Sequence, residues 1–227
     1  NLTGKRIIVT GAASGIGRAI AISLAANGAA VAAADMKSPE ATVQAIHSSG
    51  GQAVALAADV TRADQVDAMV QSCLKAFGGL DGLVNNAGMG SDQLPIWEID
   101  IATWKRDLDI NLTSQFLLCR AAAPAMIAQG YGRIVNVASA AGMEGHEFSG
   151  GYGAAKAGIA SFTVIAALEL ARFGVTVNAV APVALTRMTE GLGNAPETDE
   201  EREMRSPRWI APIVTWLAGS EAGDVTG

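Results

Sequence analysis

At 227 residues, the chain is long enough for one α/β domain with a sizeable core, and with 50% hydrophobic and 17% charged residues it is too apolar to be disordered. Its net charge of −6 argues against nucleic-acid binding or docking on anionic lipid, since both need clustered basic residues. Two cysteines and two histidines, far apart in the sequence, provide neither a disulfide framework nor a metal site. We therefore expect free thiols, no metal, and no nucleic-acid or membrane partner.

The distribution of apolar residues favours a cytoplasmic protein. The first residues show no basic region followed by an apolar run and a cleavage site. The most apolar window, between Arg18 and Asp35, is too short to span a bilayer. We expect a reduced, cytoplasmic protein.

Strand-like and helix-like segments alternate along the chain. Short apolar runs predict six strands, at 6–10, 30–34, 52–58, 80–84, 133–138 and 175–180. Longer segments between and after them predict helices, at 15–27, 39–49, 62–77, 103–129, 151–173 and 207–217. The strands are almost continuously apolar, so both faces of the sheet should be covered. The pattern predicts a Rossmann-like, doubly wound parallel sheet in a single three-layer αβα domain spanning residues 1–227.

Two segments near the end of the chain stand apart from this pattern. Residues 183–206 have weak periodicity, several glycines and an acidic run, which fits either a solvated surface loop or a mobile lid over a site. The chain stops at Val225-Thr226-Gly227, where another strand would be expected, so we expect the final strand to be missing.

A glycine-rich turn joins the first strand to the first helix. Gly11 permits the tight turn, Gly15 lets the backbone approach a pyrophosphate, and Gly17 allows the helix to pack closely on the strand. The helix N-terminus offers amide donors to an anion. No Gly-Lys-Ser/Thr follows, which disfavours an ATPase. A turn alone would also account for the glycines, but a strand before, a helix after and an acid at the right distance favour a dinucleotide site.

A second motif, Tyr152-Gly-Ala-Ala-Lys156, places a phenol and an ammonium four residues apart on one helix face. Free tyrosine has a pKa of about 10, so a neighbouring cation is needed to favour the phenolate at neutral pH. The alternative is an ordinary amphipathic helix pair.

The spacing Gly-x-x-x-Gly-x-Gly resembles that of the short-chain dehydrogenase/reductase family, and the resemblance runs from Gly4 to Gly227. It implies that Asp35 reads the adenosine ribose and repels a 2′-phosphate, which favours NAD, although Lys37 leaves NADP open. The residues that it implies for cofactor binding are Gly11, Ser14, Gly15, Ile16, Gly17, Asp35, Asp59, Val60, Asn86, Ala87, Gly88, Tyr152, Lys156, Pro182 and Leu185.

The same resemblance implies a catalytic set of Asn111, Ser139, Tyr152 and Lys156. Tyr152 would exchange the alcohol proton while hydride moves to or from the nicotinamide, and Ser139 would hold the substrate oxygen. Lys156 would bond the nicotinamide ribose and favour the phenolate, and Asn111 would anchor a water in a proton relay. After the sixth strand the pattern departs from the family, because Val183 replaces a glycine and Thr186 falls one place early.

These motifs favour an NAD-dependent enzyme that interconverts a secondary alcohol and a ketone, with a 3-hydroxyacyl thioester, a steroid or another hydroxy compound as substrate. An NADP-dependent 3-oxoacyl thioester reductase, a non-catalytic redox sensor, and an epimerase or dehydratase remain as alternatives. Four arginines would meet a phosphate or carboxylate or simply be surface charges: Arg187, Arg202, Arg205 and Arg208. The resemblance also implies a homo-oligomer, either a dimer or a homotetramer.

Overall fold

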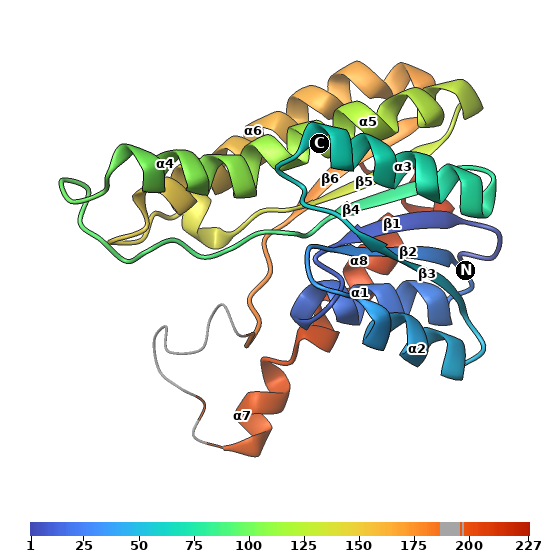
Figure 1. The fold of residues 1–227 in the computed structure, drawn as a ribbon, viewed down its shortest axis with the longest axis horizontal. Helices are drawn as coiled ribbons and strands as arrows, with labels where there is room; N and C mark the ends of the chain where they lie inside the picture. Colours follow the sequence, from blue (N-terminus) through green and yellow to red (C-terminus); the bar gives the residue numbers. More distant parts are fainter. Residues whose placement is uncertain (187–195, 197) are drawn as a thin grey trace.

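The computed structural model describes residues 1–186, 196 and 198–227, which form a single six-stranded parallel sheet with helices on both faces (Figure 1). The strand order is β3-β2-β1-β4-β5-β6, with all neighbours parallel. The strands are β1 (Arg6–Thr10), β2 (Ala30–Asp35), β3 (Gln52–Ala57), β4 (Gly82–Asn85), β5 (Gly132–Val137) and β6 (Val175–Val180). The predicted doubly wound α/β fold is therefore confirmed.

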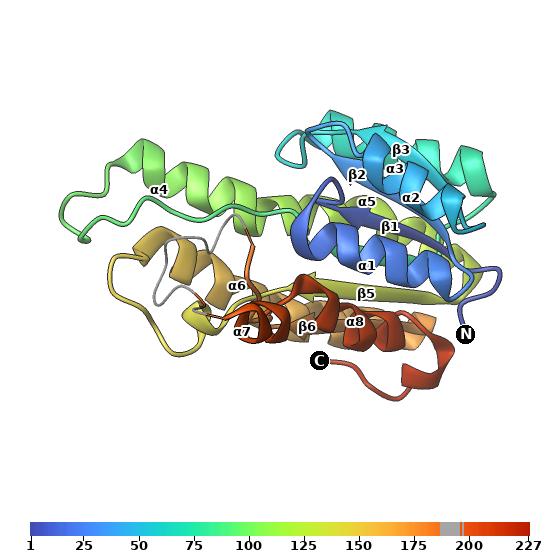
Figure 2. The same cartoon turned by 90° about the horizontal axis from the view of Figure 1, so that it is seen from below.

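Helices cover the sheet in two layers. The α-helices are α1 (Gly15–Ala26), α2 (Glu40–Ser48), α3 (Ala63–Phe77), α4 (Ile101–Leu108), α5 (Ser114–Gln129), α6 (Gly150–Leu170), α7 (Asp199–Met204) and α8 (Ala211–Leu217). In Figures 1 and 2, α1, α2 and α8 lie on one face of the sheet, and α3, α5 and α6 lie on the other. Each face has its own buried apolar cluster, and neighbouring β1 residues alternate between them: Ile7 and Val9 face one cluster, and Ile8 faces the other.

Several predicted boundaries need correction. The helix predicted over 103–129 consists of α4, a π-helical turn η1 (Asp109–Thr113) and α5, so the path is helical throughout but its hydrogen-bond pattern changes. The helix predicted over 207–217 is a 3₁₀ turn η4 (Pro207–Trp209) followed by α8. The segment predicted as a loop or lid contains α7, whose N-cap Thr198 accepts a hydrogen bond from Glu201 N at 3.1 Å.

The last residues of the chain lie beside β6. Gly227 N donates to Val177 O at 2.9 Å, and Asn178 Nδ2 donates to Val225 O at 2.9 Å. They form no seventh strand among the described residues, although they occupy the edge to which one would add.

By length and composition, Gly150–Phe173 is the one described helical run that is apolar enough to cross a membrane. Here α6 packs against β5, β6 and α4, with Ile159, Ala166 and Ala167 buried. Such burial on the sheet is typical of the core helix of an α/β domain.

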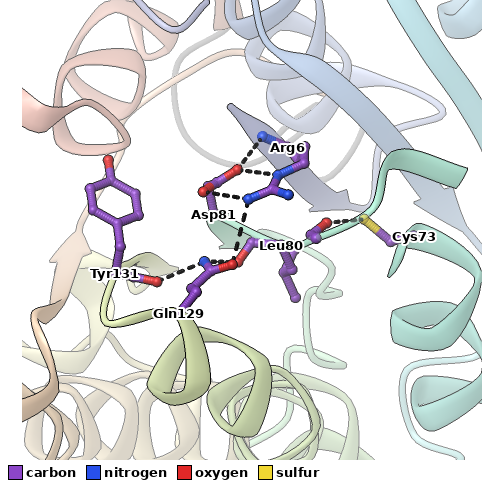
Figure 3. Close-up of polar contacts among 7 residues, drawn as sticks. Arg6, Cys73, Leu80, Asp81, Gln129 and Tyr131 are labelled. Carbon is purple, nitrogen blue, oxygen red and sulfur yellow. Dashed lines mark hydrogen bonds and ion pairs between the residues drawn. The ribbon is translucent and has the colours of Figure 1, made fainter. Parts of the chain in front are cut away.

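The edge of the sheet where the strands begin is held by a buried carboxylate (Figure 3). Asp81 accepts hydrogen bonds from Arg6 Nε at 2.6 Å, from Arg6 Nη2 at 3.0 Å and from Arg6 N at 2.9 Å. Arg133 N donates to Asp81 O at 2.9 Å, which ties the start of β5 to this pair. This edge is opposite to the one that carries the glycine turn.

Candidate active site

A cavity of about 1670 Å³ opens where the strands end, and the loops that follow β1 to β6 line it. In Figure 1, α4 and α7 lie beyond this edge of the sheet, at the left of the view. The predicted site residues that line the cavity are Gly11, Ser14, Gly15, Ile16, Asp35, Asp59, Val60, Asn86, Ala87, Gly88, Ser139, Tyr152, Lys156, Pro182 and Leu185. Gly17 and Asn111 lie behind its wall.

The glycine turn has the geometry that its sequence predicts. Gly11 and Gly15 have φ values of +68° and +56°, a region in which residues with a Cβ are strained. A Cβ at Gly17 would collide with Gly11 O, so the first turn of α1 approaches the end of β1 only because residue 17 lacks a side chain. No acidic residue lies in that first turn, so no charge on the helix itself offsets the positive end of its dipole.

Thr10, the last residue of β1, joins the glycine turn to the loop after β4. Its buried Oγ1 accepts hydrogen bonds from Asn86 N and Ala87 N, both at 3.0 Å, and donates to Val84 O at 3.3 Å. Asn86 Nδ2 donates to Thr10 O at 2.9 Å. Thr10 was not among the predicted site residues, although a hydroxyl residue directly before Gly11, at the end of an otherwise apolar strand, was a signal for it.

Asp35, at the end of β2, presents a carboxylate that its own loop and the glycine turn hold in place. Its two oxygens accept hydrogen bonds from Ala13 N at 3.0 Å and from Lys37 N at 2.9 Å. Asp59 is held in a similar way by Thr61, whose N and Oγ1 donate to its carboxylate at 2.9 and 2.7 Å. The Asp35 carboxylate is thus fixed in the wall of the cavity, next to the glycine turn.

Tyr152 and Lys156 project from the same side of the first turns of α6. Lys156 Nζ lies 5.5 Å from the centroid of the Tyr152 ring and donates to Val137 O at 2.8 Å. Lys156 is only 4% exposed, and burial lowers its pKa from 10.5 to about 8. The predicted pairing of phenol and ammonium is therefore present.

Ser139 follows β5 and lines the cavity together with Tyr152. It is the N-cap of a 3₁₀ turn, η2 (Ala140–Gly142), and its Oγ accepts a hydrogen bond from Ala141 N at 3.3 Å. This bond leaves the hydroxyl proton available to a substrate oxygen.

Asn111 lies in the π-helical turn η1, a type of turn that is frequent at functional sites. Its Nδ2 donates to Asp107 O at 3.0 Å, and its Oδ1 accepts from Met89 N at 3.2 Å. A Cβ at Gly88 would lie 2.8 Å from Asn111 Oδ1 and 3.7 Å from Lys156 Nζ. The β4 loop thus passes between Asn111 and Lys156 because Gly88 has no side chain.

Several known proteins are similar to this chain. The short chain dehydrogenase family model matches residues 5–197. The chain belongs to the short-chain dehydrogenase family. A 3-oxoacyl-[acyl-carrier-protein] reductase of Synechocystis sp. is 44% identical over 199 residues, which are 86% of this chain and 80% of the relative.

Two further family members cover nearly the whole chain. A 2,5-dichloro-2,5-cyclohexadiene-1,4-diol dehydrogenase of Sphingobium indicum is 38% identical over 100% of this chain and 94% of its own length. The crystal structure of a levodione reductase matches with a TM-score of 0.92 and 32% identity, covering 100% of this chain and 95% of that one. The protein is thus an oxidoreductase of the short-chain dehydrogenase family that acts on alcohol- or ketone-type substrates.

One buried acid of this short-chain dehydrogenase was not anticipated. Asp107, at the end of α4, is fully buried and accepts hydrogen bonds from Ser91 Oγ and, at 3.3 Å, from Arg106 Nη2. A Cβ at Gly151 would lie 2.5 Å from Asp107 Oδ2. Gly151 directly precedes Tyr152, and α6 has neither an acid in its first turn nor a side-chain cap of its own. Asp107 therefore supplies the negative charge at this helix N-terminus from a neighbouring element.

The segment after β6 closes one side of the cavity. Its described residues Pro182 to Thr186, Pro196, Arg202 and Arg205 line the wall, whereas 187–195 and 197, Arg187 among them, lie outside the described residues. Of the other predicted arginines, Arg208 is absent from the lining and pairs with Glu203 at 2.6 Å.

Proposed function

We propose that this short-chain dehydrogenase interconverts a secondary alcohol and a ketone with NAD, using Tyr152 as general acid and base. One observation carries the proposal: Ser139, Tyr152 and Lys156 line the same cavity as the glycine turn. A proton donor or acceptor is therefore next to a place suited to a dinucleotide.

The residues present fit a dinucleotide. Gly15 would leave the backbone of the turn open to a pyrophosphate, while Gly11 and Gly17 let the turn pack against Asn86 and against the end of β1. The first turn of α1 offers backbone N–H groups to the anion. Asp35 would accept a hydrogen bond from a ribose hydroxyl, and Asp59 and Val60 would flank the adenine. When bound, the nicotinamide accepts or supplies the hydride.

In the oxidation direction, Tyr152 takes the proton of the substrate hydroxyl. Ser139 donates a hydrogen bond to the same oxygen and orients the carbinol carbon. Lys156, held by Val137 O at 2.8 Å, stabilises the phenolate through its charge. Asn111 would place a water between Lys156 and solvent, so that the proton leaves the buried site. In the reduction direction Tyr152 returns the proton to the forming alkoxide.

The preference for NAD rests on Asp35. Its carboxylate is held in the cavity wall, where a second negative charge from a 2′-phosphate would be repelled. Lys37 also lines the cavity, two residues after Asp35, so an NADP-dependent 3-oxoacyl thioester reductase is the second candidate. The Synechocystis relative, a 3-oxoacyl-[acyl-carrier-protein] reductase by name, favours that reaction type, and the Sphingobium relative favours a ring diol.

We also propose that the enzyme is cytoplasmic and a homo-oligomer. Apolar side chains are exposed on the outer faces of two neighbouring helices, namely Phe116 on α5 and Val164, Ile165 and Leu168 on α6. A second copy of the chain would cover such a patch. Sedimentation velocity should show a dimer or tetramer, and Leu168→Asp should shift the distribution toward the monomer.

Replacing Tyr152 by Phe tests the reaction. We expect kcat for any secondary alcohol that is turned over to fall at least 100-fold, while the Kd for NADH changes less than threefold. Tyr131→Phe, which alters the other tyrosine of the chain on the opposite edge of the sheet, serves as the matched control and should keep kcat. Tight NADH binding without turnover of any alcohol or ketone by the unaltered protein would instead support a redox sensor.

A further inference from the structure

Phe148 is the only described non-glycine residue with a positive φ, at +61°. It lies between η2, which begins directly after Ser139, and α6, which carries Tyr152. A bulky side chain in the left-handed region is strained, and such strain is retained where the surrounding structure enforces it, often at ligand sites.

The turn around Phe148 is fixed by the residues beside it. Ser149 Oγ donates to His146 O at 2.6 Å, and Gly153 N donates to Ser149 O at 2.6 Å, which ties the turn to the first turn of α6. The strained residue is thus anchored on the helix of Tyr152.

Phe148 lines the cavity and is 47% exposed. Packing within the protein therefore buries only about half of this large apolar residue, and the rest stays available to a ligand. Met143, in the same segment, is 67% exposed but does not line the cavity. Phe148 therefore differs from Met143 both in its positive φ and in lining the cavity.

We propose that Phe148 determines substrate specificity by packing its ring against a hydrocarbon ring of the substrate, next to the carbinol carbon that Ser139 and Tyr152 address. The substrate class is a cyclic secondary alcohol or its ketone. This inference rests on the proposed function, since it assigns the substrate side of the same cavity. The free energy of packing against an aromatic face grows with the apolar area that is buried, so a hydrocarbon ring gains more from this contact than a small alkyl group does.

The test compares cyclohexanol with 2-propanol as probes. In Phe148→Asn we expect the ratio of kcat/KM for cyclohexanol to that for 2-propanol to fall about tenfold. Phe148→Tyr keeps the ring and should hold the ratio within threefold. Asparagine adopts the left-handed region more readily than phenylalanine, so Phe148→Asn should unfold at a Tm no lower than the unaltered protein. Loss of selectivity without loss of stability separates a role in specificity from a structural one.

Met143→Asn is the matched control, because it removes an exposed apolar side chain of the same segment outside the cavity. It should leave the ratio unchanged. An unchanged ratio in Phe148→Asn would overturn the proposal, as would a lower Tm. A weaker Kd for NADH in that variant would also overturn it, because the ring would then serve the cofactor.

A binding measurement keeps this test separate from that of the reaction. Saturation-transfer NMR of cyclohexanol in the presence of NADH, a pair that cannot react, should give a signal that Phe148→Asn reduces at least threefold. Suppose that the unaltered protein oxidises no alcohol but gives the NMR signal, and that Phe148→Asn reduces this signal. The proposed reaction then fails and the assignment of Phe148 stands. If turnover is present and the signal is the same in both proteins, the assignment fails and the reaction stands.

Discussion

Lys156 combines burial with a positive charge, and its ammonium donates a hydrogen bond to a backbone carbonyl, Val137 O. Burial lowers its pKa to about 8 from an ordinary 10.5, so between these pH values the unfolded chain binds more protons than the folded one. Stability from this group therefore rises with pH across that window and is lost as the pH falls through about 8. Lys156, which we propose takes part in the reaction, therefore weakens the fold at neutral pH.

Replacing Lys156 by Met should stabilise the fold and abolish catalysis. At pH 7 we expect the free energy of unfolding to rise by about 1–3 kcal/mol, because the desolvated charge is removed, while kcat is lost. The gain should shrink between pH 8 and 10, where the native lysine has already released its proton in the folded state. Urea denaturation at pH 7 and pH 9.5 measures both values, and Lys75→Met, at an exposed position, is the control. A difference between variant and native protein that does not vary with pH would contradict the prediction.

Asp35 allows a second test at a single residue. Asp35→Asn keeps an oxygen that can accept a hydrogen bond from the loop but removes the charge. The ratio of kcat/KM for NAD to that for NADP should therefore fall at least tenfold, since the repulsion of a 2′-phosphate disappears. Asp64→Asn, an exposed surface variant, should leave the ratio unchanged. A native enzyme that already prefers NADP would show that Lys37, and not Asp35, dominates this end of the cavity.

At the scale of elements, α4 and α6 meet where glycine makes room for a carboxylate. Asp107 of α4 contacts the backbone of Gly151 in the first turn of α6, and Ser91 joins the loop before α4 to the same acid. The place of Tyr152 relative to the β4 loop therefore depends on this contact. A shift of about 1 Å at a catalytic group is enough to cost on the order of 100-fold in rate.

Gly151→Ala should push the two helices apart, because its Cβ would lie 2.5 Å from Asp107 Oδ2. We expect kcat to fall at least tenfold. Adding Asp107→Ala to Gly151→Ala should recover part of the loss, since the space vacated by the carboxylate admits the new methyl group. Gly150→Ala is the matched control: its Cβ would meet only Ile99 Cδ1, the end of a flexible side chain, at 3.1 Å. If the double variant is no faster than Gly151→Ala alone, the contact with Asp107 is not what limits the position of Tyr152.

The elements also show how much of the fold can be predicted from the sequence. Continuous apolar runs predicted all six strands. In β1, β2, β4 and β5 the reason is burial on both faces, which leaves no polar side to obscure the run, whereas β3 at the edge of the sheet is only partly buried. The helical path over α4, η1 and α5 was predicted as one helix, but the π turn at Asn111 was not. A π turn differs from an α turn by one hydrogen-bond step, which side-chain periodicity does not encode. Likewise Thr10 and Asp107 act through contacts between distant segments, and a pattern of local spacing carries no information about such contacts.

At the scale of the whole molecule, the edge of the sheet where the strands end and the edge where they begin have different roles. The edge where strands end carries the glycine turn, Asp35, Ser139 and the cavity. The edge where strands begin carries Arg6 and Asp81, which tie β1 to the start of β4 and of β5. This arrangement follows from parallel strands, because every loop after a strand comes to the same edge. Changes at the beginning edge should therefore alter stability and spare catalysis.

Asp81→Ala tests this separation. It leaves the Arg6 guanidinium, whose side chain is 26% exposed, without its two-pronged carboxylate partner, and the free energy of unfolding should fall by about 2–4 kcal/mol. Arg6→Ala alone should cost at least as much, because it leaves the Asp81 carboxylate, whose side chain is only 9% exposed, without its cation. The double variant should be more stable than the sum of both losses predicts, since neither charge is then left unpaired. Below the melting temperature, kcat/KM of Asp81→Ala should stay within twofold of the native value, because the residues that line the cavity lie at the opposite edge of the sheet. A large loss of kcat/KM in a variant that is still folded at the assay temperature would show that the two edges are mechanically coupled.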